Sequence, residues 1–120
     1  MPPFIKPQEL ANRWQITRTT VYQMRDRDEL DATLIGQSVR FKGDHIAAYE
    51  SENFVPGSTG PQVLSPDPNR TFYTVKDLAA RWDLRDRTIY RRQEKGELGF
   101  VRVGYLVRVP SDVVAAIEGA

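Results

Sequence analysis

The sequence has no cysteine and a single histidine, His45, among its 120 residues. Without cysteine there is no disulfide framework, no thiolate zinc site and no thiol nucleophile, so packing alone must stabilise the fold, in a reducing compartment. A lone histidine without a second ligand argues against a metal centre. We therefore expect no metal and no other cofactor, and we expect His45 to lie on the surface.

Long hydrophobic runs are also missing. No apolar stretch reaches the roughly 18 residues that a membrane span needs, and residues 1–6 lack the basic segment and apolar core of a signal peptide. These absences predict a cytoplasmic protein. The chain also has no Ser/His/Asp constellation and no glycine-rich phosphate loop, and modules of this size are too small to enclose a pocket, so we expect no enzymatic activity.

Charge is balanced over the whole chain and uneven along it. The 17 lysines and arginines against 16 acidic residues give a net charge of +1. Residues 1–52 carry 7 basic and 8 acidic groups, whereas residues 70–120 carry 10 basic and 7 acidic groups. A surface that attracts a polyanion is therefore expected first in the C-terminal half.

The sequence repeats itself at a shift of 68 residues. Between the pairs Phe4/Phe72 and Glu50/Glu118, 16 of the 47 aligned pairs are identical, where chance would give about 3. Two copies of one module are therefore present. The identical pairs include Leu10-Ala11 with Leu78-Ala79, Arg13-Trp14 with Arg81-Trp82, Gly36 with Gly104, and Val39-Arg40 with Val107-Arg108.

The segment between the two copies, residues 52–70, contains four prolines and two glycines that interrupt any helical or strand period. The sequence therefore predicts a module 1 at residues 1–51, a Pro/Gly-rich linker at residues 52–70 and a module 2 at residues 71–120. A flexible linker of this length spans roughly 25 Å. The modules are accordingly expected to lie either side by side or well apart.

Each copy is predicted to form a helix, a second helix, a short hairpin and a last helix. In the second copy, Thr74 and Asp77 suit a capping box before the first helix, and Gly96 suits the end of the second. Two short strands flank Gly104-Tyr105, a pattern typical of a type II′ turn, and Ser111 suits the cap of the last helix. The predicted fold class is mainly α with small β-hairpin wings, arranged as two tandem winged helix-turn-helix modules.

Three short patterns follow one another in both copies: Leu-Ala-x-Arg-Trp in the first helix, Thr-Val/Ile-Tyr in the second, and x-Val/Ile-Gly-x-x-Val-Arg in the hairpin. With these patterns, about 95 of the 120 residues resemble the excisionase and AlpA-like members of the MerR-type DNA-binding superfamily. The resemblance implies a sequence-specific protein of a phage or mobile element that binds double-stranded DNA in the bacterial nucleoid. Its role would be that of a recombination directionality factor, which bends DNA, or of a transcriptional regulator.

The second helix of each copy carries side chains that suit a DNA groove. Arginine can bind guanine with two donors, glutamine can pair with adenine, and threonine and tyrosine hydroxyls reach phosphates. The hairpins add side chains for the DNA backbone or the minor groove. The predicted DNA-binding residues are Arg18, Thr19, Tyr22, Gln23, Arg40, Lys42, Arg85, Arg87, Tyr90, Arg91, Arg102, Tyr105 and Arg108.

Some of these residues have a structural alternative. Tyr22 and Tyr90 either pack against the first helix or contact phosphate, and the arginines either bind DNA or form a solvated helix face. Arg108 either contacts DNA or packs along its strand against the first helix. Trp14 and Trp82, by contrast, are predicted as core anchors, because each follows a leucine by four residues on one helix face.

Two functional hypotheses follow from these observations. In the first, the chain is a covalent pseudo-dimer that binds DNA through both modules, as a monomer or in a cooperative assembly on DNA. In the second, one module binds DNA and the other binds a protein such as an integrase, a terminase subunit or a polymerase. The run Arg25-Asp26-Arg27-Asp28-Glu29 favours a protein partner for module 1, because its acidic groups weaken any contact with phosphate.

Overall fold

The computed structural model describes residues 1–119, which form six helices and two antiparallel sheets of three and four strands. Helices account for 44% of the chain and strands for 21%. The elements are, in order, β1 (Phe4–Ile5), α1 (Pro7–Trp14), α2 (Arg18–Asp26), β2 (Thr33–Ile35), β3 (Ser38–Lys42), α3 (Gly43–Glu52), β4 (Phe54–Val55), β5 (Phe72–Tyr73), α4 (Val75–Trp82), α5 (Asp86–Glu94), β6 (Phe100–Val103), β7 (Leu106–Pro110) and α6 (Ser111–Glu118).

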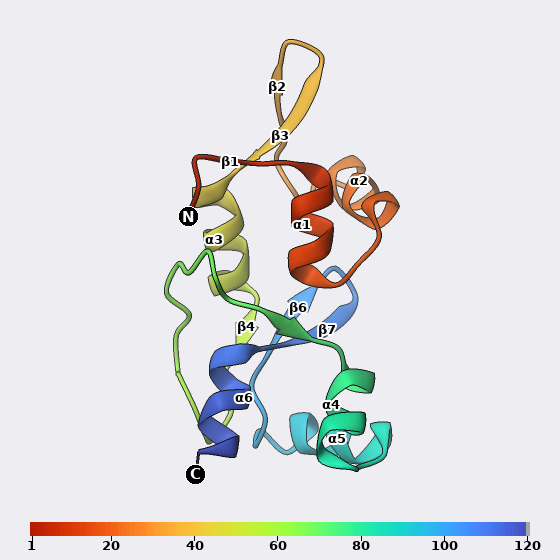
Figure 1. Ribbon diagram of the computed structural model, residues 1–120, viewed down its shortest axis with the longest axis vertical. Helices are drawn as coiled ribbons and strands as arrows, with labels where there is room; N and C mark the ends of the chain where they lie inside the picture. Colours follow the sequence, from red (N-terminus) through yellow and green to blue (C-terminus); the bar gives the residue numbers. More distant parts are fainter. Residues whose placement is uncertain (120) are drawn as a thin grey trace.

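The two repeats have the same order of elements (Figure 1). The N-terminal repeat comprises β1, α1, α2, β2, β3 and α3, and the C-terminal repeat comprises β5, α4, α5, β6, β7 and α6. The strand order is β1-β3-β2 in one sheet and β4-β6-β7-β5 in the other. Because β4 follows α3 and pairs with β6, with Phe54 opposite Val101, the end of the N-terminal repeat completes the sheet of the C-terminal repeat.

The fold class predicted from the sequence is wrong, because the chain is not mainly α with small wings. Each hairpin is extended into a larger sheet by a two-residue strand that precedes the first helix of its repeat. Phe4 lies opposite Lys42, and Phe72 lies opposite Pro110. Strands of two residues have no alternating pattern that a sequence could display. As a result, β3, β6 and β7 are inner strands of two sheets in a mixed α and β fold.

Local sequence explains where most elements begin and end. Thr74 and Asp77 form the predicted capping box of α4. Gly104 has a φ of 62° at the first position of the β6–β7 turn, the left-handed conformation that the predicted turn requires. Ser111 does not cap α6, because its hydroxyl accepts a hydrogen bond from the backbone beside β5, and Pro110 occupies the cap position instead.

The β6–β7 hairpin extends from its own repeat into the N-terminal one. Val101 and Val103 are no more than 1% exposed and belong to the same buried cluster as Trp14 of α1. At the turn, the Gly104 amide donates to Tyr49 Oη of α3 at 2.9 Å. The two repeats therefore share a hydrophobic core where they meet.

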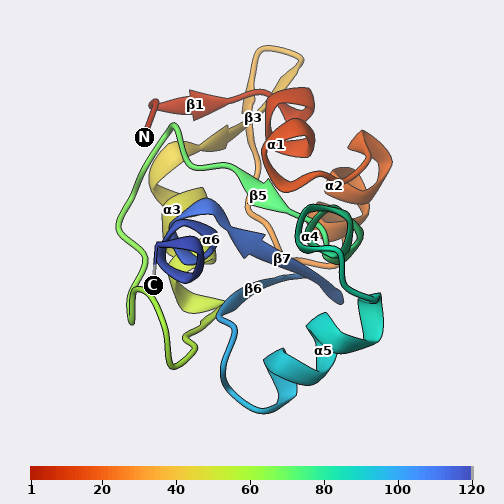
Figure 2. The ribbon, with the colours of Figure 1, turned by 60° about the horizontal axis from the view of Figure 1, so that its bottom comes forward.

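Residues 52–70, the predicted linker, run along one side of the molecule past α3 and α6 (Figure 2) and are tied to both repeats. Besides contributing β4, this segment buries Leu64, which is 5% exposed. Arg13 Nη2 of α1 also donates to the carbonyl oxygen of Asp67 at 2.9 Å. These contacts hold the two repeats side by side.

A buried carboxylate links α1 to α3 and to the C-terminal repeat. Glu50, 1% exposed, accepts hydrogen bonds from Arg13 at 2.6 and 2.8 Å and from Trp14 Nε1 at 2.8 Å. Arg70, itself 5% exposed, lies 3.7 Å from Glu50 and donates to Asp112 of α6 at 2.7 and 3.1 Å. Paired and hydrogen-bonded in this way, the buried charges are compensated and connect the two repeats.

The C-terminal repeat contains the same clamp in a more exposed place. Glu118 of α6 accepts hydrogen bonds from Arg81 at 2.6 and 2.8 Å and from Trp82 Nε1 at 2.8 Å. Trp14 is fully buried, which confirms its prediction as a core anchor, whereas Trp82 is only half-buried. The duplicated Arg-Trp pair thus serves to attach the first helix of each repeat to the last.

We expect Glu50→Gln to destabilise the protein strongly. The amide cannot balance the charges of Arg13 and Arg70, and breaking a buried ion pair costs about 3 to 5 kcal/mol. Glu118→Gln is the matched control: it removes the equivalent carboxylate from a partly exposed clamp and should cost much less. Urea unfolding compares the two variants. Equal losses would contradict the role given to burial.

We also expect stability to fall as the pH drops from about 4.5 toward 2. Hydrogen bonds from Arg81 and Trp82 lower the pKa of Glu118 from 4.5 to about 2, and the hydrogen bond from Arg70 lowers the pKa of Asp112. A carboxylate whose pKa is lowered by folding stabilises the protein above its unfolded pKa and loses that contribution on acidification. In thermal unfolding, Glu118→Gln should therefore lose less Tm than the wild type over this range. Parallel profiles would show that Glu118 makes no such contribution.

Candidate nucleic-acid interface

The outer face of α2 presents polar side chains to solvent. Arg18, Thr19 and Gln23 are exposed on this helix, which follows α1 after a three-residue turn. Tyr22 is half-buried, and the guanidinium of Arg25 lies 4.8 Å from the centre of its ring. The face thus offers one arginine and two neutral hydrogen-bonding side chains, and Tyr22 is partly packed against the protein.

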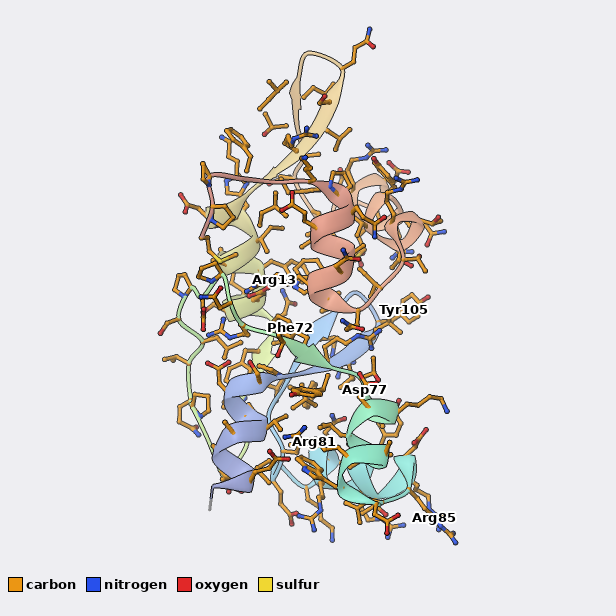
Figure 3. All side chains as sticks on the ribbon, in the orientation of Figure 1. Arg13, Phe72, Asp77, Arg81, Arg85 and Tyr105 are labelled. Atoms are coloured by element: carbon orange, nitrogen blue, oxygen red, sulfur yellow. The ribbon has the colours of Figure 1, made fainter. Side chains whose placement is uncertain are left out.

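The equivalent face of α5 is more basic. Arg87, Tyr90 and Arg91 are exposed and, at spacings of three and four residues, share one face of the helix. Arg85, at the cap position before α5, projects from the end of the molecule (Figure 3). Tyr90 is 47% exposed, so its hydroxyl is accessible from solvent.

Ion pairs divide the arginines of these helices into engaged and free ones. On α2, Arg25 bonds to Asp26 at 2.9 Å, and on α5 Arg92 lies 3.7 Å from Glu97. Four arginines in or next to these helices are predicted for DNA contact, and none of them forms an ion pair within residues 1–119. They are Arg18, Arg85, Arg87 and Arg91.

The two helices lie on one side of the molecule. In both Figure 1 and Figure 2, α2 and α5 are on the side away from α3 and α6. The repeats follow one another along a long axis of 47 Å. Successive major-groove faces on one side of B-DNA are about 34 Å apart. The molecule is therefore long enough to reach two adjacent faces, with α2 and α5 separated by less than its full length.

Arg108 of β7 is engaged within the protein. Its Nε donates to the Trp14 carbonyl at 2.8 Å and its Nη2 donates to the Gln15 carbonyl at 2.9 Å, at the C-terminal end of α1. A cation is favourable at this end of a helix, and burial lowers the pKa of Arg108. Its guanidinium thus joins the two repeats, and we do not include it in the proposed interface.

The other predicted hairpin residues lie at two separate places. Tyr105 is 73% exposed at the β6–β7 turn (Figure 3), and Arg102 is exposed with its guanidinium 5.6 Å from the centre of the Phe100 ring. Lys42 is exposed and Arg40 half-buried on β3, in the hairpin at the opposite end of the N-terminal repeat. The structure therefore places the helices α2 and α5 on one side of the molecule but does not bring the two hairpins together.

The residues that hold this face in place were not candidate site residues in the sequence. In the alignment of the two repeats, Arg13 is identical to Arg81 and Glu50 is identical to Glu118. This identity was the sequence signal that the two pairs share a structural role. Arg70 has no counterpart in such a pattern, because its role depends on the packing of the two repeats.

Comparisons with known proteins found no matching family model, no similar curated protein and no similar solved structure. Within residues 1–119, no group of three or more histidine, aspartate or glutamate side chains is placed to hold a metal ion. No helix of this described part is long and apolar enough to cross a membrane.

We expect Arg108→Ala to lower the stability by about 2 to 3 kcal/mol, since hydrogen bonds to a charged group contribute about 1.5 to 3 kcal/mol. Arg40→Ala is the matched control, because it makes the same change at the equivalent position of the other hairpin, where no bond between the repeats is lost. Thermal unfolding should show a lower Tm only for Arg108→Ala. A similar shift in both variants would mean that Arg108 stabilises its own strand and not the contact between repeats.

Proposed function

We propose that the protein binds double-stranded DNA through α2 and α5. The observation that carries this proposal is the set of exposed arginines that form no ion pair within the described chain, on the second helix of both repeats. No internal salt bridge has to break before these side chains bind phosphate or guanine, which makes them available as donors. They are Arg18, Arg85, Arg87 and Arg91.

The duplication supports binding through both repeats. Because the repeats are fixed to each other, α2 and α5 hold a constant spacing along the 47 Å axis. A pre-organised pair of helices loses little conformational freedom on binding, so the second contact adds to the affinity of the first. Two neighbouring half-sites on one side of the duplex fit this arrangement.

The resemblance to excisionase and AlpA-like proteins supports the same partner. On that basis the protein acts in the cytoplasm as a recombination directionality factor or as a transcriptional regulator of a phage or mobile element. A protein partner is the second candidate, and one observation favours it: Leu34 is 69% exposed and Ile35 is 50% exposed at the β2–β3 hairpin. Exposed apolar side chains next to one another are typical of protein contacts.

We expect α5 to contribute more of the DNA affinity than α2. Arg87→Ala and Arg91→Ala should each cost about 1 to 3 kcal/mol of binding free energy, as is usual for an arginine that contacts a base. Arg18→Ala should cost less, since α2 presents a single free arginine. Fluorescence anisotropy on a duplex selected from random sequences measures the affinities.

Arg92→Ala is the control for that experiment. It removes the same charge from the same helix, but its guanidinium is paired with Glu97 and lines a pocket beside α4 and α6. If Arg92→Ala weakens binding as much as Arg87→Ala, the affinity depends on net charge and not on the proposed face. If neither the wild type nor any variant binds DNA, the protein partner becomes the favoured function.

A further inference from the structure

The two hairpins are equivalent in sequence but have different surroundings. In the β6–β7 hairpin, Val103 is 1% exposed because the tip is inserted into the N-terminal repeat. The residue at the same position of the β2–β3 hairpin is Ile35, which is 50% exposed, and this hairpin projects from the end of the molecule (Figure 1). One hairpin therefore has a receiving site, and the other is a free copy of the same element.

The receiving site in the N-terminal repeat is built at the end of α1 and on α2 and α3. The carbonyls of Trp14 and Gln15 accept hydrogen bonds from Arg108. Tyr49 Oη accepts the amide of the turn at 2.9 Å. Met24 lies against the turn, with its sulfur 3.9 Å from the position of a Cβ on the turn glycine.

The equivalent place in the C-terminal repeat is an open pocket of about 560 Å³. The 68-residue shift places Trp82, Arg92 and Ile117 where the N-terminal repeat has Trp14, Met24 and Tyr49. These three residues line the pocket. The rest of the lining comes from Leu84, Glu97, Leu98 and Glu118 of the C-terminal repeat and from Ser58 and Thr59 of the segment between the repeats.

The backbone of this pocket also reproduces the receiving site. Asp83 has φ 52° and ψ 50°, and its counterpart Gln15 has φ 54° and ψ 46°, so the carbonyls at the ends of α4 and α1 are oriented alike. The Gln15 carbonyl binds Arg108. Among the hydrogen bonds formed by residues 1–119, none uses the carbonyls of Trp82 or Asp83.

Arg40 of the free hairpin makes the same hydrogen bond to the preceding residue as Arg108 of the inserted hairpin does. Its Nη1 donates to the carbonyl of Val39 at 2.8 Å, and Nη1 of Arg108 donates to the carbonyl of Val107 at the same distance. Arg108 uses its remaining donors on the end of α1. The remaining donors of Arg40 form no hydrogen bond to the described part of the chain, so they are free to bind carbonyls of another molecule.

We propose that the β2–β3 hairpin of one molecule inserts into the pocket between α4, α5 and α6 of a second copy. The contact would repeat the one that joins the two repeats, with Ile35 in the pocket and Arg40 on the carbonyls of Trp82 and Asp83. The β2–β3 hairpin lies at one end of the long axis and the helices α4, α5 and α6, which carry most of the pocket lining, lie at the other (Figure 1), so the hairpin of a molecule cannot enter the pocket of the same molecule. Such a head-to-tail contact leaves one hairpin and one pocket free at the ends and can extend into an open chain of molecules.

The contact should be weaker than the internal one. Ile117 lacks the hydroxyl by which Tyr49 accepts the turn amide, and Arg92 replaces the apolar Met24. A small interface of this kind gives a reversible association that depends on protein concentration. The proposal does not depend on DNA binding, and the experiment uses no DNA to detect it.

The test is sedimentation velocity over a wide range of protein concentrations with three single variants of the full chain. Ile35→Glu disables the hairpin, and Leu84→Glu disables the pocket; both positions are exposed, so the fold should be kept, as thermal unfolding will check. Val63→Glu is the matched control, since it places the same charge on an exposed apolar residue away from both surfaces. The wild type and Val63→Glu should associate, whereas Ile35→Glu and Leu84→Glu should each remain monomeric.

A mixture of the two inactive variants gives the decisive result. The intact hairpin of Leu84→Glu should insert into the intact pocket of Ile35→Glu, so the mixture should form a 1:1 dimer that grows no further. A symmetric dimer in which hairpin meets hairpin, or pocket meets pocket, would not be restored in this way. Should Ile35→Glu unfold, Arg40→Ala on the same hairpin takes its place, with an expected weakening of self-association of several-fold.

Several outcomes would overturn the proposal. They are a wild type that stays monomeric at every concentration, Ile35→Glu associating as the wild type does, and a mixture that stays monomeric although each variant is folded. A parallel DNA-binding measurement adds one more. If Ile35→Glu no longer binds DNA but sediments as the wild type does, the free hairpin contacts DNA and not a second copy.

Discussion

The side chains of Val101 and Val103 belong to the C-terminal repeat and are buried in the core of the N-terminal repeat. Burial of two valines contributes about 1.5 to 3 kcal/mol for each side chain. The bonds made by Gly104 and Arg108 add direction to this apolar contact, because they fix the hairpin against α3 and the end of α1. The angle between the repeats, and with it the placement of α2 and α5, depends on this insertion.

A fixed junction changes what a duplicated protein can do. Two modules on a flexible tether search independently and lose freedom when both bind, whereas helices held by one shared core would meet the proposed DNA partner as a single surface. The Glu50 network strengthens this effect, since Arg70 ties α3 to α6 through buried charge. Only the β6–β7 hairpin is inserted into the other repeat. The β2–β3 hairpin therefore has no receiving site within the molecule and the pocket of the C-terminal repeat receives no hairpin, and the proposed self-association follows from this difference.

Sequence reasoning predicted the local features well and the contacts between repeats poorly. The capping box at Thr74, the glycine turn at Gly104 and the burial of Trp14 follow from local patterns, and the duplication is visible by aligning the sequence with itself; the structure confirms all four. The fold class was wrong because two-residue strands such as Phe72–Tyr73 have no periodicity. The candidate residues on α2 and α5 could be proposed from their chemistry. A structural role for Arg108 was one of two alternatives, but its partners could not be identified, because they are carbonyls of the other repeat, more than 90 residues away in the chain.

The most direct test of the account is native-state hydrogen exchange at the two turn glycines. The amide of Gly104 is bonded across the repeats to Tyr49, whereas the amide of Gly36, at the same position of the free hairpin, is exposed at the end of the molecule. If the repeats form one cooperative body, the Gly104 amide should exchange only by global unfolding, as slowly as the interior of α1, and the Gly36 amide should exchange rapidly. Rapid exchange at both glycines while α1 stays protected would contradict the account, because it would show that the hairpin opens without unfolding the N-terminal repeat.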